Sequence, residues 1–439
     1  MPLVHPVFAL DSPGGVGHFV GMTLRSAETV YDVLVVGAGL AGLAGALALA
    51  HAGASVCLCD AAKRPPAKPS GADMDPRVTA LSPSSVLMLE VLGLRNLRNS
   101  PVAGMKVSAV HPDAGLMPGL LSFGDDTENA QALAFIQPNG ALLRALRAAV
   151  SAHPGIDQAF ETSVERIITH AAHVDLFCTD GEKLQAKVLV GADGRQSTIR
   201  KRAGIDAFEY DYGTTAIVTT LTHSAPHEHT ARQFFRPAGP LACLPLGKTR
   251  NRWTTSLVWP EKNNLAQALL GLGLNDLRIE LADRLDGLLG DVTKLAPPVS
   301  YPLGLLLAQN YVGPRLALLG EAAHIIHPLA GQGYNLTLRD AAQLADCYHD
   351  ARRLGLDVGA PATLAEYDRL RRRDATLMAS ATHMFATAFS ARPHFWAPWR
   401  KALFSAANRA PLLRAMAGRT ADLGHGPVPR LLRGEGFTG

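Results

Sequence analysis

The sequence predicts an α/β protein with a mainly antiparallel β part in its middle and a helical part toward its C-terminus. Three observations predict this class. Residues 31–60 follow a strand–turn–helix–strand pattern, residues 206–300 change to repeated short strand patterns, and residues 315–346 show a strand, a Pro/Gly loop and a long helix. The chain has 439 residues, a length that fits two or three structural units at about 150 residues each.

Composition excludes several other classes of protein. The chain is 47% hydrophobic and 18% charged, which excludes a disordered chain. Five scattered cysteines make no disulfide framework and favour a reducing compartment such as the cytoplasm, and Cys57 and Cys59 are expected to be core residues. A net charge of only +4, with no dense basic tract that carries interleaved aromatic residues, argues against a nucleic-acid partner.

Residues 1–29 are expected to form a flexible extension. They are rich in Gly and Pro and lack the basic start of a signal peptide, and Met22 is a second candidate for the start of translation. The longest uncharged run, residues 33–50, is long enough to span a membrane. A glycine turn between a strand and a helix explains this run better, because a second strand pattern follows it.

The first structured element is a βαβ unit. Residues 31–36 fit a buried parallel strand, an Ala/Leu-rich helix runs to about His51, and a second strand, SVCLCD, ends at Asp60. Between the first strand and the helix lies the sequence GAGLAG, residues 37–42. In this context the glycine pattern is the Rossmann-like fingerprint of dinucleotide binding.

Each residue type in the fingerprint has a physical reason. Gly37 permits the tight turn, Gly39 lets a pyrophosphate approach the backbone, and Gly42 lets the helix pack against the strand. The helix N-terminus supplies free N–H groups and a partial positive charge for the phosphates. Asp60 would accept hydrogen bonds from a ribose hydroxyl group. The fingerprint alone leaves both NAD and FAD open.

Two later segments decide between these cofactors. Residues 187–204 show a strand that is broken by GADG and followed by a basic helix, and residues 315–346 show the strand, loop and helix described above. With them the chain resembles the class A FAD-dependent aromatic monooxygenases, and within that class the UbiH/UbiF/VisC-type ubiquinone-biosynthesis hydroxylases. The matching motifs span about residues 31–420 and are VVGAGLAGLAGALAL, DPRVTALSPSSVLMLEVLGL, LVGADGRQSTIRKRAG, GPLACLPL and AAHIIHPLAGQGYNLTLRDAAQLAD.

The resemblance implies FAD as the cofactor and NAD(P)H as a transient electron donor. It places Arg77 near the flavin pyrophosphate, and Asp193 at the FAD ribose and on the route by which NAD(P)H reaches the flavin. The implied cofactor-binding positions are Gly37, Gly39, Leu40, Ala41, Gly42, Asp60, Arg77, Asp193, Gly194, Gly320, Glu321, Pro328, Gly331, Gly333 and Asn335. No catalytic acid or base is assigned. The flavin-side loop, residues 327–333, contributes His327, Pro328, Gly331, Gln332 and Gly333 beside the isoalloxazine ring.

The flavin-side loop also has a physical logic of its own. Its glycines expose N–H groups, and a helix that begins near Tyr334 would aim its positive end at the same point. Such a site stabilises an anion, here the reduced flavin, although simple helix capping is the alternative. One position departs from the family, because Glu321 stands where aspartate is usual. Its extra methylene requires the carboxylate to fold back or to act through water.

No metal site is expected. His223, His227 and His229 lie close together in HSAPHEH, but no further cluster of ligands accompanies them. His324 and His327 are three residues apart, and they lie inside the flavin motif.

The domain organisation follows from these segments. The discontinuous FAD-binding domain is predicted over residues 30–104, 125–205 and 300–350, the substrate-binding sheet over 105–124 and 206–299, and a C-terminal helical region over 351–439. Trp253 and Trp259 lie in the substrate part, as expected for a sheet that walls an aromatic pocket.

The activity that the resemblance implies is hydroxylation of the aromatic ring of a polyprenylated phenol in ubiquinone biosynthesis. The reaction would use NAD(P)H and O2 and proceed through a C4a-hydroperoxyflavin. Two alternatives stay open. One is another FAD-dependent hydroxylase or reductase with a different aromatic or isoprenoid substrate, and the other is a noncatalytic flavin-binding accessory protein. The ring position and the choice between NADH and NADPH also stay open.

The C-terminal segment carries the basic surplus of the chain. Residues 375–421 contain no Asp or Glu, but they contain six Lys or Arg residues interleaved with six Phe or Trp residues. This composition is typical of an interfacial amphipathic helix, and the alternative is a helix packed on the flavin domain. We expect this segment to hold the enzyme at the inner face of the cytoplasmic membrane, where a polyprenyl substrate resides. Other ubiquinone-biosynthesis proteins are candidate partners there.

Overall fold

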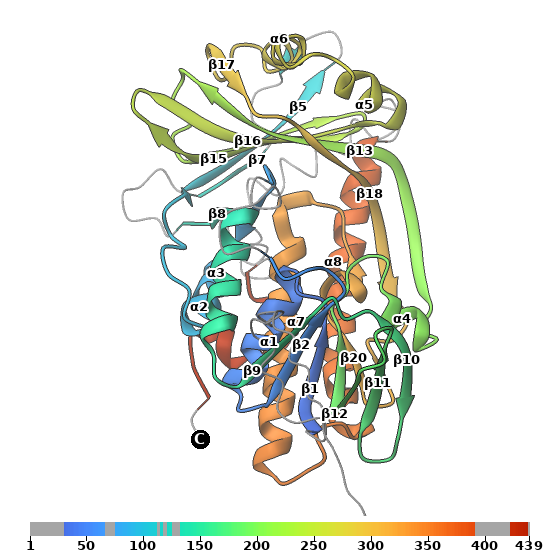
Figure 1. Cartoon of the computed structure of the whole chain (residues 1–439). Helices are drawn as coiled ribbons and strands as arrows, with labels where there is room; N and C mark the ends of the chain where they lie inside the picture. The colour runs from blue at the N-terminus through green and yellow to red at the C-terminus, as the bar shows by residue number, and fades with distance from the viewer. Residues whose placement is uncertain are drawn as a thin grey trace, which may run out of the picture.

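The structure is a computed structural model that describes residues 30–65, 75–111, 115–116, 121–124, 132–390 and 422–437. A sheet-rich upper part stands on an α/β lower part, and several long elements run between them (Figure 1). The predicted extension over residues 1–29 lies outside the described residues, as does most of the basic C-terminal segment.

The lower part is built on an eight-stranded sheet in which strands β10-β11-β12-β1-β2-β9 are successive neighbours. Strand β1 pairs in parallel with β12 and β2, and β20 pairs in parallel with β12. Its strands are β1 (Val30–Val36), β2 (Val56–Asp60), β9 (Ile156–Phe160), β10 (Val164–Thr169), β11 (Val174–Cys178), β12 (Lys183–Gly191), β19 (Val312–Gly313) and β20 (Leu316–Leu318).

Helices cover this sheet and account for the long apolar run. Residues 33–50 form most of β1, the glycine turn and most of helix α1 (Leu40–His51). Helix α1 packs on α3 (Asn139–Ala152) and α7 (Gln332–Arg353). None of the helices in the described ranges is long and apolar enough to cross a membrane.

The upper part is a ten-stranded sheet in which strands β21-β18-β13-β16-β15-β14-β5-β6 are successive neighbours. Most of its pairs are antiparallel, but β5 pairs in parallel with β14. Its strands are β5 (Gly104–His111), β6 (Gly115–Leu116), β7 (Leu121–Phe123), β13 (Ala207–His223), β14 (Thr230–Arg236), β15 (Gly239–Thr249), β16 (Arg252–Lys262), β17 (Val292–Leu295), β18 (Val299–Ala308) and β21 (His324–Ile325).

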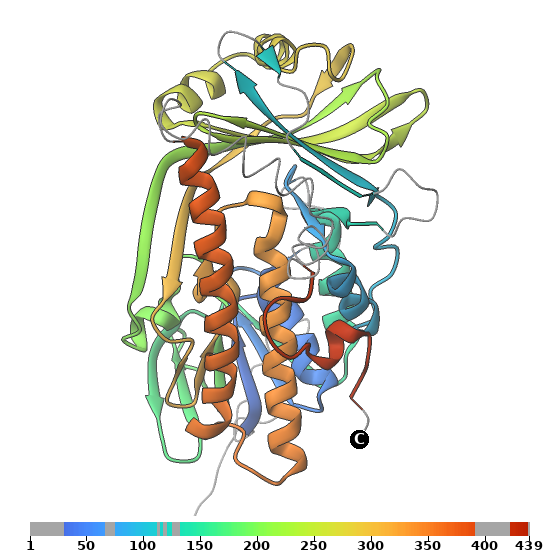
Figure 2. The ribbon, with the colours of Figure 1, turned by 180° about the vertical axis from the view of Figure 1, so that it is seen from behind.

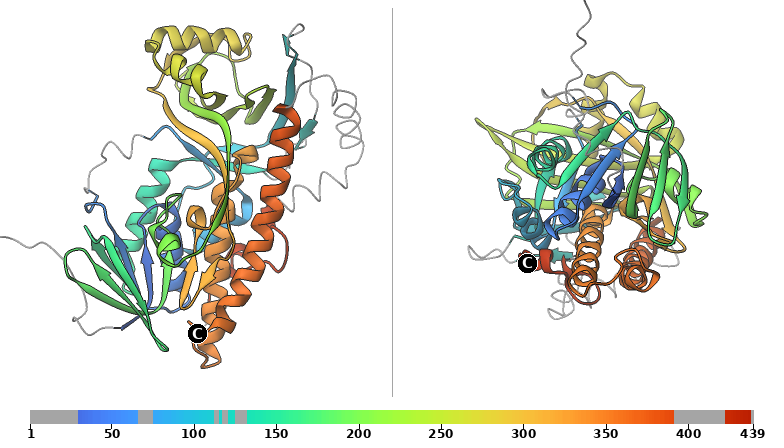
Figure 3. Two further views of the ribbon diagram at one scale, coloured as in Figure 1. Left: turned by 90° about the vertical axis from the view of Figure 1, so that its right-hand side faces the viewer. Right: turned by 60° about the horizontal axis from the view of Figure 1, so that its bottom comes forward.

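One predicted domain boundary differs from the structure. The sequence predicts a return to the FAD-binding domain at residue 300, but this residue lies near the start of β18, which pairs with β13 in the ten-stranded sheet. The difference arises because β13 and β18 are long strands that run together from the upper part down to the lower part (Figure 3). The two parts therefore share these strands.

The remaining elements connect or cover the two sheets. Helix α8 packs on α7 and extends upward until its far end meets β14 and β15 (Figure 2). Strands β3, β8 and β4 form a separate three-stranded sheet. These elements are β3 (Val78–Leu81), β4 (Pro101–Val102), β8 (Ala134–Pro138), α2 (Pro83–Val91), α4 (Thr198–Arg202), α5 (Asn263–Leu270), α6 (Leu274–Arg284), α8 (Pro361–Ser390) and the 3-10 turns at Gly320–Ala322, Leu329–Gly331 and Arg430–Arg433.

Candidate active site

A cavity of about 2070 Å³ lies between the lower and upper parts. Its wall includes the start of α1, strand β3, the flavin-side loop, strands of the upper sheet and the upper end of α8. Twelve of the residues singled out from the sequence line it: Gly39, Leu40, Ala41, Arg77, Gly194, Glu321, His327, Pro328, Gly331, Gln332, Gly333 and Asn335. A pocket for one small ligand typically has about 300–1,000 Å³, so this cavity can hold a dinucleotide together with a second molecule.

The glycine turn has the geometry that its sequence predicted. Gly37 has a φ of +109°, and a Cβ there would lie 2.5 Å from the carbonyl oxygen of Ala192. A Cβ on Gly42 would lie 1.7 Å from the carbonyl oxygen of Gly37. By contrast, a Cβ on Gly39 would meet nothing within 4 Å. The backbone is therefore open to the cavity where a pyrophosphate has to approach.

The N-terminus of α1 supports the same conclusion. No side chain caps it, and its first residues, Leu40 and Ala41, line the cavity. Uncapped N–H groups and the positive end of a twelve-residue helix form a favourable place for phosphate oxygens.

The flavin-side loop brings a second helix N-terminus to the cavity. Helix α7 begins at Gln332, slightly earlier than the predicted start near Tyr334, because Gly331 takes the left-handed conformation (φ +64°) and serves as its N-cap. A Cβ on Gly331 would lie 2.9 Å from the Cβ of Ala80, so only glycine fits there without displacement. A Cβ on Gly333 would meet no atom within 4 Å, and no side chain caps α7. Two uncapped helix N-termini thus face one cavity.

Asn335 fixes the loop rather than facing the cavity with a free amide. Its Oδ1 accepts a hydrogen bond from the Ser82 backbone N–H at 3.0 Å, and its Nδ2 donates to the carbonyl oxygen of Ala80 at 2.9 Å. These bonds hold the start of α7 against β3 and α2.

Two predicted carboxylates are directed at the backbone and do not line the cavity. Asp60 accepts hydrogen bonds from the N–H groups of Ala38 at 2.5 Å and Ala62 at 2.7 Å. Asp193 accepts from Thr198 N–H at 2.6 Å, and so caps the start of α4. Each carboxylate therefore shapes a turn next to the site, and its direct contact with a ribose stays a prediction. Gly320 does not line the cavity either, and its backbone takes the left-handed conformation with a φ of +63°.

Arg77 and Glu321 form the charged end of the cavity together with Asp75. Arg77 donates from Nε to Asp75 at 2.7 Å, and this hydrogen bond raises the pKa of the guanidinium further above its usual range. Burial is the main cause that raises the pKa of the nearby Tyr301 hydroxyl, and the Glu321 carboxylate contributes. An anionic cofactor would meet Arg77 at this end.

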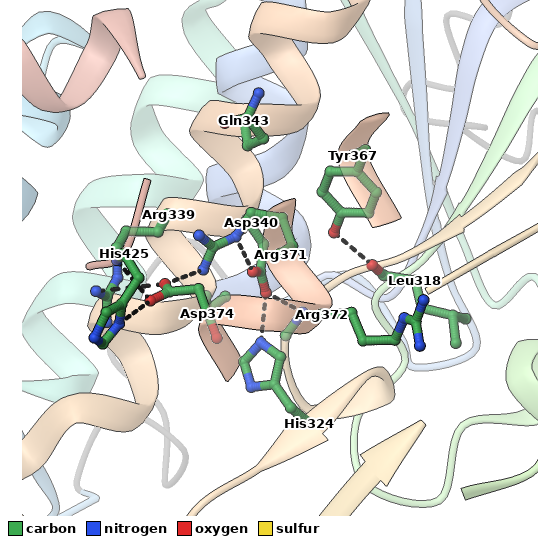
Figure 4. Close-up of polar contacts among 12 residues, drawn as sticks. Leu318, His324, Arg339, Asp340, Gln343, Tyr367, Arg371, Arg372, Asp374 and His425 are labelled. Atoms are coloured by element: carbon green, nitrogen blue, oxygen red, sulfur yellow. Dashed lines mark hydrogen bonds and ion pairs between the residues drawn. The ribbon is translucent and has the colours of Figure 1, made fainter. Parts of the chain in front are cut away.

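A buried ion-pair network supports the flavin-side loop from behind (Figure 4). Asp340 of α7, which is fully buried, accepts from His324 Nε2 at 2.5 Å and from Arg371 Nε at 2.8 Å. Arg371 of α8 also pairs with Asp374 at 2.9 Å, and Asp374 accepts from the backbone N–H of His425 at 2.9 Å. The network therefore joins β21, α7, α8 and the chain at His425.

The electrostatics of this network favour its charged form. Burial alone would raise the pKa of the Asp340 carboxyl, but the charges of His324 and Arg371 outweigh burial and lower it. Burial likewise opposes ionisation of Asp374, and Arg371 and Arg339 outweigh it. Asp340, Arg371 and Asp374 were not predicted from the sequence. One feature of the sequence could have indicated them: Arg339 and Asp340 are charged residues within a stretch of the predicted helix that is otherwise mostly apolar.

The upper sheet and α8 form the apolar wall of the cavity. The lining residues here include Val107, Phe235, Ala242, Leu244, Val258, Pro260, Met378 and Phe385. Trp259, which the sequence placed in this sheet without a role, is fully buried on the opposite face of β16 in a cluster with α5 and α6. Strand alternation explains this, because Val258 and Pro260 flank Trp259 and therefore point to the other face.

The histidines of HSAPHEH have structural partners. His223 Nε2 lies 2.8 Å from Thr255 Oγ1, and His227 packs edge-on against Trp253. In the described ranges, the residues whose ligand atoms are close enough for a metal are His170, His173 and Asp175, where Asp175 already pairs with Lys183 at 2.9 Å. All five cysteines are buried and unpaired.

Fold and site together define a class of protein: a flavoprotein in which a nucleotide-binding βαβ unit and an antiparallel sheet enclose a cofactor and an organic substrate. The chain belongs to the FAD binding domain family, whose profile matches residues 30–379. It is an FAD-dependent aromatic hydroxylase, as the motifs predicted.

Two relatives and one solved structure illustrate the similarity. Ubiquinone hydroxylase UbiL of Rhodospirillum rubrum is 37% identical over 440 residues, which cover 99% of both chains. The 3-demethoxyubiquinol 3-hydroxylase of Escherichia coli is 33% identical, over 82% of this chain and 90% of that one. PqsL of Pseudomonas aeruginosa, solved in complex with 2-aminobenzoylacetate, aligns with a TM-score of 0.69 at 25% identity, over 86% of this chain and all of that one.

The residues present fit FAD. The α1 N-terminus and Gly39 would hold its pyrophosphate, and the α7 N-terminus with Gly331 and Gly333 would face the flavin ring. The chemistry that FAD supplies when bound is acceptance of a hydride from NAD(P)H and activation of O2. The chain itself contributes two positive helix ends, a charged end at Arg77 and an apolar wall that excludes water.

Proposed function

We propose that this chain hydroxylates the aromatic ring of a polyprenylated phenol in ubiquinone biosynthesis, with NAD(P)H and O2 as co-substrates. The observation that carries the proposal is the size and apolar lining of the cavity beyond the two helix N-termini. After FAD is accommodated, a long apolar molecule can occupy the remaining space against the upper sheet and α8. The named activities of the relatives from Rhodospirillum rubrum and Escherichia coli support a ring precursor of ubiquinone as that molecule.

The chain would act on such a substrate by orientation and exclusion of water. The lining of β16 and the α8 residues Met378 and Phe385 offer apolar surface to an isoprenoid tail. The flavin-side loop would keep the ring next to the cofactor. The buried pair of Asp340 and Arg371 ties α7, which follows this loop, to α8.

Quinone profiling tests the proposal in cells. Deletion of the gene is expected to abolish or reduce ubiquinone and to accumulate one hydroxylation intermediate, whose structure identifies the ring position. Reintroduction of the intact gene is expected to restore ubiquinone. An unchanged quinone profile in the deletion strain would contradict the proposal.

We also propose that residues 375–421 hold the enzyme at the inner face of the cytoplasmic membrane. Residues 375–390 belong to α8, on which three apolar side chains are exposed: Leu377 (41%), Met384 (62%) and Phe385 (39%). Phe385 also lines the cavity, so the helix that would meet lipid borders the substrate space. Residues 391–421 supply the basic and aromatic composition, and they lie outside the described residues.

Flotation with anionic liposomes tests this localisation. The FAD-loaded protein is expected to float with phosphatidylglycerol-containing vesicles at low salt and to be released as salt rises, because basic residues contribute about 1 kcal/mol each near an anionic surface. No flotation at low salt would contradict the proposal.

A further inference from the structure

His327 occupies the junction between the flavin-side loop and the upper sheet. Its side chain is 3% exposed and lines the cavity, and its backbone directly precedes Pro328. The ring of Tyr212, from β13, meets the imidazole edge-on with ring centres 5.0 Å apart. The Tyr212 hydroxyl is in turn 3.0 Å from Nδ1 of His383, on α8. Three elements therefore fix the imidazole.

Among the residues that the structure describes, no group forms a hydrogen bond with the imidazole of His327. Nδ1 is enclosed without a hydrogen bond, and no hydrogen bond joins either ring nitrogen to a side chain or backbone group in the described ranges. Polar groups in protein interiors are almost always paired, and the pairing that the described residues do not supply to Nε2 can come from a molecule in the cavity. Because Nδ1 is enclosed, Nε2 is the ring nitrogen that remains for a molecule in the cavity.

The ring is also neutral under physiological conditions. Burial, followed by the nearby His383, lowers the pKa of His327 to about 4. A neutral imidazole offers one N–H donor and one lone pair, so Nε2 can pair with an oxygen substituent of an uncharged substrate. Burial, followed by Tyr210, raises the pKa of the Tyr212 hydroxyl to about 12, so Tyr212 is neutral as well. The neighbours of the imidazole are therefore the uncharged Tyr212 phenol and His383.

We propose that Nε2 of His327 forms a hydrogen bond with the phenolic oxygen of the substrate ring and so fixes the ring's orientation beside the flavin. The proposal rests on the proposed function, since it names the contact that the phenol makes. In a cavity with an apolar wall, one well-placed polar group determines which way a ring lies. Tyr212 is a positioning residue, because it holds the imidazole through ring contact and is itself held by His383.

A purely structural role for His327 predicts different behaviour. If the imidazole only fills space, leucine of similar size should cost stability or leave everything unchanged. If the imidazole is retained for a ligand, leucine removes an unpartnered polar group, so thermal stability should be kept or raised while phenol recognition falls.

The test uses the FAD-loaded full chain with two probes, 2-geranylphenol and its methyl ether, 2-geranylanisole. The variants are His327→Leu, His327→Asn and His327→Gln, of which only the glutamine amide can reach the position of Nε2. His229→Gln, at an exposed site in the turn before β14, is the matched control. Probe affinity is measured from the perturbation of flavin absorbance, and turnover from probe-stimulated NAD(P)H oxidation.

The parent is expected to prefer the phenol to the anisole. His327→Leu and His327→Asn should weaken phenol binding and kcat/KM about tenfold to a hundredfold and abolish that preference, without loss of FAD content or thermal midpoint. His327→Gln should recover most of the preference, and His229→Gln should match the parent.

Two results would overturn the inference about His327 and leave the proposed function intact. One is a parent that responds to the phenol while His327→Leu keeps the full preference for it. The other is an equal loss in the Leu and Gln variants that is accompanied by loss of FAD or of thermal stability, which indicates packing. A parent that neither binds nor responds to the phenol contradicts the proposed function, and the inference is then refuted with it.

Discussion

Neutralising Asp340 is expected to destabilise the protein strongly, because this fully buried carboxylate balances two partners at once. It accepts from His324 at 2.5 Å and from Arg371 at 2.8 Å. In Asp340→Asn the side chain keeps its shape, but its amide can accept from only one of these donors and turns an NH2 group toward the other. Removing one partner of a buried ion pair costs about 3–5 kcal/mol, and we expect a loss in that range.

Urea unfolding at pH 7 measures this loss, and Glu366→Gln on α8 is the matched control. Glu366 pairs with Arg369 at 4.0 Å, and both side chains are more than 60% exposed, so its neutralisation should cost less than about 1 kcal/mol. The pH dependence gives a second check. Because the pKa of Asp340 is lowered on folding, the carboxylate stabilises the fold above about pH 4, and its contribution disappears as the pH falls through the lowered value. If Asp340→Asn cost no more than Glu366→Gln, the network would not be the support described here.

Further predictions concern the cofactor site and the membrane. Gly42→Ala would place a Cβ 1.7 Å from the Gly37 oxygen and should lower FAD affinity at least tenfold with loss of apoprotein stability, whereas Gly39→Ala should lower FAD affinity with the apoprotein melting temperature unchanged. Glu321→Asp should bind FAD at least as tightly as the parent in fluorescence titration, and a large loss would show a pocket adapted to glutamate. Met384→Glu should reduce liposome flotation severalfold without changing FAD content, and full retention of flotation would exclude this helix end from the contact.

Local geometry explains why the nucleotide-binding turn could be predicted from the sequence. The turn depends on residues within one βαβ unit, and the close approaches at Gly37 and Gly42 follow from the backbone path itself. The flavin-side loop was predictable for the same reason, although Gly331 starts α7 two residues earlier than expected.

Features that depend on contacts between distant segments could not be predicted. The partners of Asp340 come from α8 and from β21, and nothing in the helix that carries Asp340 indicates which charges it will meet. The sequence of β16 shows that Val258 and Trp259 point to opposite faces of the sheet. It does not show which face borders the cavity, because that depends on where α5 and α6 pack. The carboxylates of Asp60 and Asp193 turn to the backbone because N–H groups of neighbouring turns are within reach.

The most direct test of the central claim is the fate of molecular oxygen in the purified reaction. FAD-loaded protein is incubated with a polyprenylated phenol, NAD(P)H and 18O2, and the product is analysed by mass spectrometry. We predict a hydroxylated ring that carries one 18O atom for each NAD(P)H consumed above the substrate-free rate. NAD(P)H oxidation that yields only hydrogen peroxide, or a product without 18O, would contradict the assignment as a ring hydroxylase of polyprenylated phenols.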